Sequence, residues 1–259
     1  MLLAGRVGIV SGVGPGLGRA IACAFAREGA DVVLAARTPE ALEEVAAAVR
    51  AAGRRALAVP TDIVRAEDCR RLVEAALAAF GRIDVLVNNA FRSAPYEAVE
   101  DARMDHWRAI FDVNVFGAVT LSQAVVPPMK AAGGGAIVMI GSMSMRVIEP
   151  RFGGYAASKG ALLVAARTMA KELGPAGIRV NSVVPGYIWG PNLERWFAKL
   201  AAERGTTSEA VYAEVAARTA LGRIPTAAEV AEAVVFFASD RSRAITGQTL
   251  DVNAGHYFA

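Results

Sequence analysis

The fold is decided near the start of the chain, by the stretch Val7-Gly8-Ile9-Val10-Ser11-Gly12-Val13-Gly14-Pro15-Gly16-Leu17-Gly18. Its first five residues are mostly apolar and predict a buried strand, and a helical pattern begins at Leu17. Glycines between the two let a backbone approach a pyrophosphate, and the free N–H groups of the helix start favour an anion. The glycine spacing is G-x-x-x-G-x-G rather than the commoner G-x-G-x-x-G. Tight turns also use glycine, but this position between strand and helix predicts a nucleotide site.

The rest of the chain alternates short β-branched runs with longer segments rich in Ala, Leu, Glu and Arg. We predict strands at Val7–Ser11, Asp31–Ala36, Ala56–Pro60, Val85–Asn88, Ala136–Ile140, Arg179–Val184 and Thr249–Val252. We predict helices at Leu17–Glu28, Pro39–Ala52, Ala66–Phe80, about Asp105–Ala131, Tyr155–Leu173 and Ala227–Ser239. Repeated β-α-β units predict an α/β fold with a doubly wound parallel sheet of about seven strands and helices on both faces.

No linker, charge block or low-complexity tract divides the 259 residues, so we expect a single dinucleotide-binding domain over 1–259. A mostly helical insertion at about 189–226 interrupts the alternation before the last strand. Glycines follow several predicted helices, and we expect them to be C-caps: Gly29, Gly53, Gly81 and Gly174.

Composition excludes several other classes of protein. A net charge of +3 with scattered arginines gives no nucleic-acid patch. Cys23 and Cys69 lack paired spacing, and His106 and His256 lie far apart, so we expect neither a disulfide nor a metal site. No stretch approaches ~20 consecutive apolar residues, so we expect no membrane span. The N-terminus lacks the ordered regions of a signal peptide, and the expected location is cytoplasmic.

Tyr155 and Lys159 stand four residues apart in Tyr-Ala-Ala-Ser-Lys, on one face of a predicted helix. A phenol ordinarily ionises near pH ~10, and an ammonium held beside it favours the phenolate. The pair could therefore serve as a general acid/base. The same spacing also occurs by chance on many helices, so other motifs must decide between the two interpretations.

Those motifs make the chain resemble the single-domain branch of the short-chain dehydrogenase/reductase family, over essentially its whole length. The resemblance rests on residues that follow the family's order: Ser11 with the glycine loop, Asp62, Asn88-Asn89-Ala90, Asn114, Ser142, Tyr155 with Lys159, Pro185-Gly186 and Thr246-Gly247-Gln248. It implies that Tyr155 is the acid/base, that Lys159 lowers its pKa and binds the nicotinamide ribose, and that Ser142 holds the substrate oxygen. Asn114 would anchor a water in a proton relay. Ser144 is a close competitor of Ser142.

The same resemblance implies a nicotinamide cofactor. It assigns cofactor binding to Ser11, Gly12, Gly16, Leu17, Gly18, Arg37, Thr38, Asp62, Ile63, Asn89, Ala90, Tyr155, Lys159, Pro185, Gly186 and Ile188. At the end of the second strand, Ala36 stands where an NAD enzyme usually has an acidic residue, and Arg37 follows. A guanidinium can bind a 2′-phosphate through two hydrogen bonds, so NADP(H) is favoured and NAD(H) stays possible. Pro15 argues the other way, since many NADP-preferring relatives carry a basic residue there.

The chain departs from the family pattern at two positions. Phe91 replaces the glycine of Asn-Asn-Ala-Gly, and Gly190 replaces a threonine that often contacts the cofactor. We predict a hydrophobic substrate pocket from Phe91, Ser142, Met143, Phe152, Trp189 and Trp196. Packing within the insertion, or a subunit interface, would explain the aromatic residues of the insertion equally well.

The expected function is NADPH-dependent reduction of a small hydrophobic ketone, or oxidation of the corresponding secondary alcohol. The alternatives are a 3-oxoacyl thioester reductase, an NAD-dependent alcohol dehydrogenase and a non-catalytic nucleotide-binding regulator or subunit. The resemblance also implies a homotetramer or homodimer, paired through the helices near Asp105–Ala131 and Tyr155–Leu173.

Overall fold

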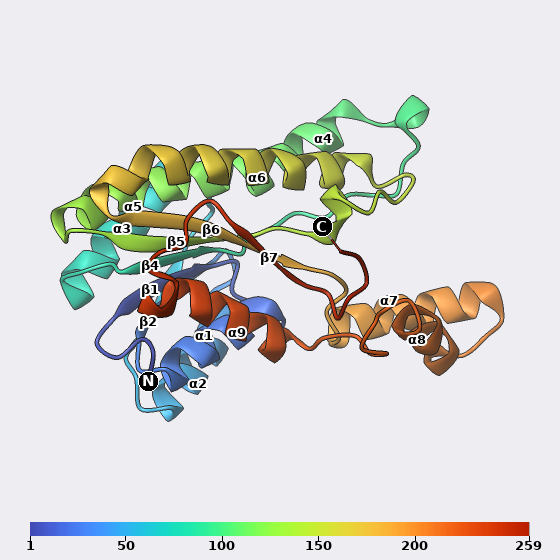
Figure 1. Cartoon of the computed structure of the whole chain (residues 1–259), viewed down its shortest axis with the longest axis horizontal. Coiled ribbons are helices and arrows are strands. Elements are labelled where there is room, and N and C mark those ends of the chain that lie inside the picture. Colours follow the sequence, from blue (N-terminus) through green and yellow to red (C-terminus); the bar gives the residue numbers. More distant parts are fainter. Residues whose placement is uncertain (259) are drawn as a thin grey trace.

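In a computed structural model, which describes residues 1–258, seven strands form one parallel sheet in the order β3-β2-β1-β4-β5-β6-β7 (Figure 1). At its centre, β1 (Val7–Ser11) pairs with β2 (Asp31–Ala36) on one side and β4 (Val85–Asn88) on the other. The outer strands are β3 (Ala56–Pro60), β5 (Gly135–Ile140), β6 (Ile178–Pro185) and β7 (Thr249–Val252). The order reverses between β1 and β4, where an open parallel sheet binds its ligand. The predicted doubly wound fold is confirmed.

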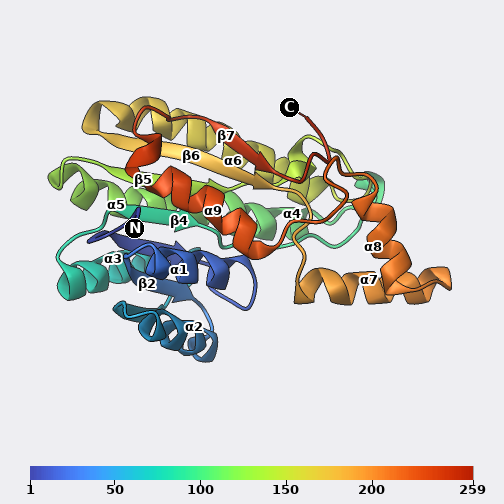
Figure 2. The same cartoon turned by 60° about the horizontal axis from the view of Figure 1, so that its bottom comes forward.

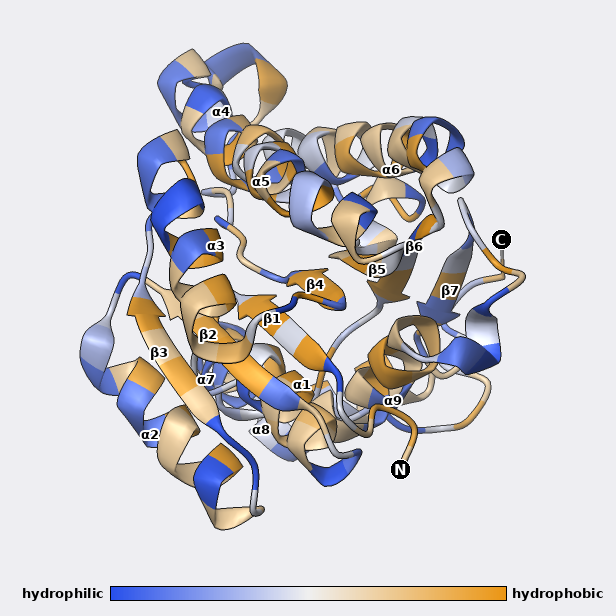
Figure 3. Ribbon diagram, turned by 90° about the vertical axis from the view of Figure 1, so that its left-hand side faces the viewer, coloured by the Kyte–Doolittle hydropathy of each residue, from blue (hydrophilic) through white to orange (hydrophobic). Residues whose placement is uncertain are grey.

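Helices cover both faces of the sheet (Figures 1 and 2). One face carries α1 (Leu17–Arg27), α2 (Pro39–Ala51) and α9 (Ala227–Ala238). The other carries α3 (Ala66–Phe80), α5 (Ala118–Ala131) and α6 (Gly153–Leu173). Each layer forms a buried apolar cluster with its face of the sheet. Viewed from one end, mostly hydrophobic strands lie between the two helical layers (Figure 3), as expected for parallel strands buried on both faces.

The predicted helix near Asp105–Ala131 is interrupted. It consists of α4 (Met104–Phe111), a π-helical turn at Asp112–Gly117 and α5. A π-helical turn inserts one extra residue, and such turns occur frequently at functional sites. By length and composition alone, residues 104–131 could also cross a membrane, with a mean hydropathy of 1.6 in an 18-residue window, and buried core helices pass the same test. In the structure this helix is part of the core, because Leu121, Val125 and Met129 are fully buried.

The predicted glycine caps are correct except at one position. Gly81 ends α3 in the left-handed conformation, and Gly29 and Gly53 also have positive φ angles. Gly174 has a φ of −51° and begins a 3₁₀ turn that continues to Ala176, and Gly177 adopts the left-handed conformation instead, with φ of 73°. Pro175 fits the first turn of this extension, because its fixed φ is already helical.

The predicted insertion folds as α7 (Pro191–Arg204) and α8 (Ser208–Ala216). The two helices extend away from the sheet and its covering layers (Figures 1 and 2). They have a small core of their own around the fully buried Phe197. An apolar core within the pair explains how the two helices keep their shape at a distance from the main layers.

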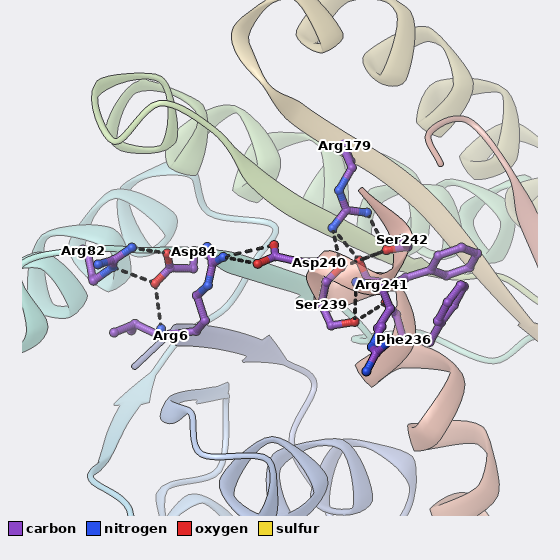
Figure 4. Close-up of polar contacts among 11 residues, drawn as sticks. Arg6, Arg82, Asp84, Arg179, Phe236, Ser239, Asp240, Arg241 and Ser242 are labelled. Carbon is purple, nitrogen blue, oxygen red and sulfur yellow. Dashed lines mark hydrogen bonds and ion pairs between the residues drawn. The ribbon is translucent and has the colours of Figure 1, made fainter. Parts of the chain in front are cut away.

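A buried carboxylate binds the amino ends of the central strands, at the end of the sheet opposite the glycine loop (Figure 4). Asp84, just before β4, accepts hydrogen bonds from the backbone of Val7 at 2.8 Å and from Arg82 at 2.6 and 2.9 Å. Arg6 contacts Asp84 at 3.3 Å and both oxygens of Asp240 at 3.0 Å. The network joins the starts of β1 and β4 to the segment that follows α9, and so fixes the base of the fold.

Candidate active site

The loop between β1 and α1 has a shape that only glycine allows at two positions. Gly12 has a φ of 69°, and a Cβ there would lie 2.3 Å from the Cα of Ala90. A Cβ on Gly18 would lie 2.5 Å from the carbonyl oxygen of Gly12. At Gly16, by contrast, a Cβ would meet nothing within 4 Å. The loop is thus packed against its neighbours at both ends and open in the middle, beside the unpaired N–H groups of the helix start.

Hydrogen bonds fix this loop to the end of β4. The side chain of Asn89 donates to the carbonyl oxygens of Ser11 and Gly12, at 3.2 and 2.8 Å. In return, the Ser11 hydroxyl accepts from the backbone N–H groups of Asn89 and Ala90, at 3.2 and 3.4 Å. Ser11 and Asn89 therefore fix the conformation of the glycine loop. The sequence predicted only that they bind the cofactor.

A cavity of about 270 Å³ opens at the carboxyl ends of β1 to β4. Its lining includes six of the predicted cofactor residues, namely Gly12, Arg37, Thr38, Asp62, Ile63 and Ala90. Within residues 1–258, the exposed Arg37 has no ion-pair or hydrogen-bond partner. Arg92 and Val113 line the same cavity and were missed by the sequence interpretation, although each is adjacent to a residue that it named. A cavity with free guanidinium groups fits a phosphorylated nucleoside.

Asn114 lies in the π-helical turn and is almost fully buried. Its amide donates to the Ser158 hydroxyl at 2.9 Å and to the Arg92 carbonyl at 3.1 Å, and its oxygen accepts from the Arg92 N–H at 2.7 Å. The side chain thus joins the loop after β4 to α6. The structure brings Asn114 to the predicted site, and its role in a water relay stays a prediction.

Ser142 follows β5 and caps a 3₁₀ turn formed by Met143–Met145. Its hydroxyl accepts from the backbone N–H of Ser144 at 3.2 Å, and the two serine hydroxyls lie 3.0 Å apart. Both candidates for the substrate-holding serine are therefore in one hydrogen-bonded pair. A hydrogen bond with Ser142 also favours ionisation of Tyr155, which connects the pair to the phenol.

Tyr155 and Lys159 share the same face of α6. Burial raises the pKa of Tyr155 to about 12, against the smaller lowering effect of Ser142. The Lys159 ammonium lies 5.7 Å from the centre of the tyrosine ring and donates to the carbonyl oxygen of Ile140 at 2.7 Å. Burial lowers the pKa of Lys159 to about 8. Burial is the largest influence on the phenol in the free protein. The lowering of the Tyr155 pKa by Lys159 stays a prediction.

The end of β6 supplies the remaining predicted cofactor residues. Pro185 is the last residue of the strand, and the N–H of Gly186 donates to the carbonyl of Val252 at 3.1 Å. A Cβ on Gly186 would lie 2.9 Å from that of Asn253, so the two segments are in close contact. Ile188 packs against the core cluster beneath α9. This segment lies at the carboxyl end of β6.

The predicted substrate residues fall into two groups. Phe152 lies 4.8 Å from the Tyr155 ring, Phe91 lies 6.4 Å from it, and Met143 is buried in the turn after Ser142. Trp189 and Trp196 instead pack within the insertion, at 5.8 and 5.4 Å from the ring of Phe197. Both tryptophans therefore pack within the insertion, and their place in a substrate pocket stays a prediction.

Taken together, the residues fit a dinucleotide. The fold offers a loop open at Gly16, a cavity with an unpaired Arg37, and a phenol beside a serine pair at the point where the strand order reverses. Within residues 1–258, no cluster of three or more His, Cys, Asp or Glu side chains could hold a metal ion. The fold and the site are those expected of a nucleotide-dependent oxidoreductase.

Comparison with known proteins gives the same class. Residues 12–257 match the family described as Enoyl-(Acyl carrier protein) reductase. An uncharacterised oxidoreductase of Methylorubrum extorquens is 39% identical over 256 residues, which cover 98% of each chain. L-Sorbose reductase from Gluconobacter frateurii, solved with NADPH and L-sorbose, is 32% identical, with a TM-score of 0.93 over 99% of this chain and 98% of that one. Carveol dehydrogenase from Mycobacterium avium, solved with NAD, is 30% identical, with a TM-score of 0.92 over 98% of each chain.

The chain belongs to the short-chain dehydrogenase/reductase family. It is an NAD(P)-dependent oxidoreductase, and the activities of its relatives support action on alcohols and ketones. The relatives differ in cofactor, since one of the two solved structures holds NADPH and the other NAD.

Proposed function

We propose that this protein reduces a hydrophobic ketone to a secondary alcohol with NADPH. The observation that carries the proposal is the environment of the Tyr155 phenol. A phenol is already protonated at neutral pH. Burial raises the pKa of Tyr155 further, to about 12, with Ser142 as the one group that lowers it. A protonated phenol beside a second hydroxyl can donate to a carbonyl oxygen and then transfer a proton to it. The surrounding rings of Phe91 and Phe152 favour an apolar substrate.

In this proposal, the carbonyl oxygen accepts hydrogen bonds from Tyr155 and Ser142. A nicotinamide bound in the cavity would supply the hydride to the carbonyl carbon, or accept it in the reverse reaction. As negative charge develops on the oxygen, Tyr155 transfers its proton there, and Ser142 stabilises the charge by its hydrogen bond. Lys159 is expected to bind the nicotinamide ribose, a role that requires its ammonium to share or leave the Ile140 carbonyl.

The preference for NADPH rests on charge at the end of β2. Arg37 is exposed and lines the cavity, and Arg92 lines it from the other side. Asp62 is the one carboxylate in the lining, and one of its oxygens accepts from the N–H of Val64 at 3.2 Å. The cavity lining thus carries two positive guanidinium groups and one negative carboxylate. This balance favours NADPH, which has a 2′-phosphate, over NADH, which lacks it.

We further propose that the protein forms a homotetramer or homodimer through α5 and α6. An apolar groove of about 800 Å³ lies between these helices, and Val164, at its surface, is 63% exposed. A second copy of the same groove is the occupant that the family resemblance implies. Exposed apolar surface of this kind marks a contact between proteins.

The test is reduction of a panel of aryl, alkyl and cyclic ketones by the purified protein with NADPH and NADH. We expect turnover that is lost in Tyr155→Phe, because the ring stays but the transferable proton is absent. Fluorescence titration should show that Tyr155→Phe still binds NADPH. Undiminished turnover in that variant, or binding of NADPH without reduction of any ketone, would contradict the proposal, and the second result would favour a non-catalytic nucleotide-binding protein.

A further inference from the structure

Phe91 stands in an unusual position for a large apolar side chain. Its ring is 58% exposed, although it follows the buried strand β4 and its neighbours Asn88, Asn89 and Ala90 are mostly covered. The ring meets Tyr155 at 6.4 Å with an interplanar angle of 74°, an edge-to-face geometry. It also lines the cavity that contains Arg37 and Asp62. One ring therefore borders both the cofactor cavity and the phenol.

The backbone on both sides of Phe91 is fixed. Before it, the N–H of Ala90 donates to the Ser11 hydroxyl at 3.4 Å, and the Ala90 Cα lies so close to Gly12 that no side chain could stand between them. After it, the N–H and carbonyl of Arg92 are both bound by Asn114, at 2.7 and 3.1 Å. The backbone that carries the Phe91 ring is thus held by hydrogen bonds on both sides. Such a ring is a preorganised contact surface.

Other rings extend this surface around the phenol. Phe152 lies 4.8 Å from the Tyr155 ring at an angle of 33°, and Tyr96 stacks on Phe152 at 4.9 Å and 16°. Tyr96 is itself half exposed. Four rings thus follow one another from the cofactor side to the outside, with the reacting hydroxyl among them.

We propose that Phe91 is a specificity-determining residue that selects carbonyl compounds with a flat, aromatic group directly attached to the carbonyl carbon. This inference rests on the proposed function. A carbonyl oxygen bound at Tyr155 places its substituents beside the exposed part of Phe91. A flat ring can lie against that surface in an edge-to-face or offset-stacked arrangement, which is more favourable than contact with a saturated ring of the same size.

The experiment compares acetophenone with cyclohexyl methyl ketone, which differ mainly in whether the ring is flat. We would measure kcat/KM for both with the complete protein and NADPH, in the unmodified chain, Phe91→Leu, Phe91→Gly and the control Phe258→Leu. Phe258 is a phenylalanine that is 85% exposed in the tail that follows β7. We expect the unmodified chain and the control to prefer acetophenone about tenfold, and both Phe91 variants to reduce that preference about fivefold, a contribution of the size known for aromatic pairs.

Binding measurements separate this inference from the proposed function. The dissociation constants of both ketones, measured by saturation-transfer NMR in the presence of NADP⁺, require no turnover. A preference for acetophenone that depends on Phe91 in these titrations supports the inference even if no reduction occurs, whereas absent reduction contradicts the proposed function alone. The inference is overturned if the unmodified chain binds the cyclohexyl ketone equally well or better, or if neither Phe91 variant changes the preference by more than twofold. NADPH affinity, measured in the same variants, shows whether any change in turnover arises from the cofactor instead.

Discussion

The ammonium of Lys159 donates to the carbonyl oxygen of Ile140 at 2.7 Å, and thereby joins α6 to the carboxyl end of β5. The side chain is 2% exposed, so the positive charge is almost completely removed from water. Burial of an ammonium disfavours the charged form, and the pKa of Lys159 falls from 10.5 to about 8. Lys159 therefore reduces the stability of the free protein at neutral pH, as residues placed for function often do.

The first prediction concerns how the loss of stability caused by the buried Lys159 ammonium depends on pH. Between pH 8 and 10.5 the unfolded chain retains a proton on Lys159 that the folded chain has released, so the contribution of Lys159 to the free energy of unfolding rises with pH in this window. Below pH 8 both states are protonated and the cost is complete. Lys159→Met should therefore be more stable than the unmodified chain at pH 7, and its advantage should shrink by about 3 kcal/mol towards pH 10.5.

Urea unfolding of both proteins at several pH values measures this difference, and other titrating groups cancel in the comparison. Lys171→Met, an exposed lysine on the same helix, controls for the general loss of a positive charge. A stability difference that stays constant or widens above pH 8 would show that Lys159 is not buried as a cation.

The second prediction concerns Asn114. Replacing it with Ala removes three hydrogen bonds and leaves both backbone groups of Arg92 unpaired, while the Ser158 hydroxyl keeps its bond to the Tyr155 carbonyl. We expect a loss of about 2 to 3 kcal/mol in the free energy of unfolding, because buried polar groups without partners are costly. The Arg92 amide should also exchange its hydrogen faster. Ser158→Ala, which removes only one of the three bonds, is the control, and equal exchange at Arg92 in Asn114→Ala and the unmodified chain would contradict the prediction.

Much of this arrangement could be predicted from the sequence, for a physical reason. Strands such as Val85–Asn88 are buried on both faces, so their apolar runs indicate both the element and its layer. The π-helical turn could not be predicted, since one extra residue in a turn leaves the apolar pattern of the helix nearly unchanged. Asn114 was found by resemblance alone, and its bonds to Arg92 and Ser158 depend on how three elements pack together.

The direction of Lys159 is a second feature that spacing could not predict. A separation of four residues places Lys159 and Tyr155 on one face of α6, but the ammonium can turn towards any acceptor within reach. Here that acceptor is the carbonyl of Ile140, which is nineteen residues earlier in the chain.

Likewise, Gly174 and Gly177 both follow α6, and the 3₁₀ turn between them decides which one ends the helical segment. Both outcomes depend on tertiary contacts rather than on local sequence.

The third prediction concerns the cofactor. Arg37→Ala should weaken NADPH binding about tenfold or more, because a charge-assisted hydrogen bond to a phosphate would be lost, and should change NADH binding by less than about threefold. Fluorescence titration with both nucleotides at two salt concentrations measures this. Arg70→Ala, on the exposed side of α3, is the matched control. Equal affinities for the two nucleotides in the unmodified chain would remove the preference for NADPH.

The fourth prediction concerns the base of the fold. Asp84→Ala removes a carboxylate that is 5% exposed and leaves the N–H of Val7 without its partner. We expect a loss of about 2 to 3 kcal/mol in the free energy of unfolding, because Arg82 loses its carboxylate partner and Arg6 keeps only Asp240. Asp105→Ala breaks an ion pair with Arg108 in which both side chains are about three-quarters exposed, and should change stability by less than about 0.5 kcal/mol. Similar effects of the two substitutions in urea unfolding would show that the Asp84 network is not structural.

The last prediction concerns assembly. Apolar side chains of α5 and α6 surround Val164 in a groove, so a second copy of the same face would remove them from water. Val164→Arg would place a guanidinium in that interface, where burial without a partner is costly. We expect the molar mass from light scattering to fall to half or less of the unmodified value. Leu221→Arg, at a leucine that is 65% exposed and outside the groove, should leave the mass unchanged. A monomeric unmodified chain, or a Val164→Arg variant of full mass, would show that this face does not hold the copies together.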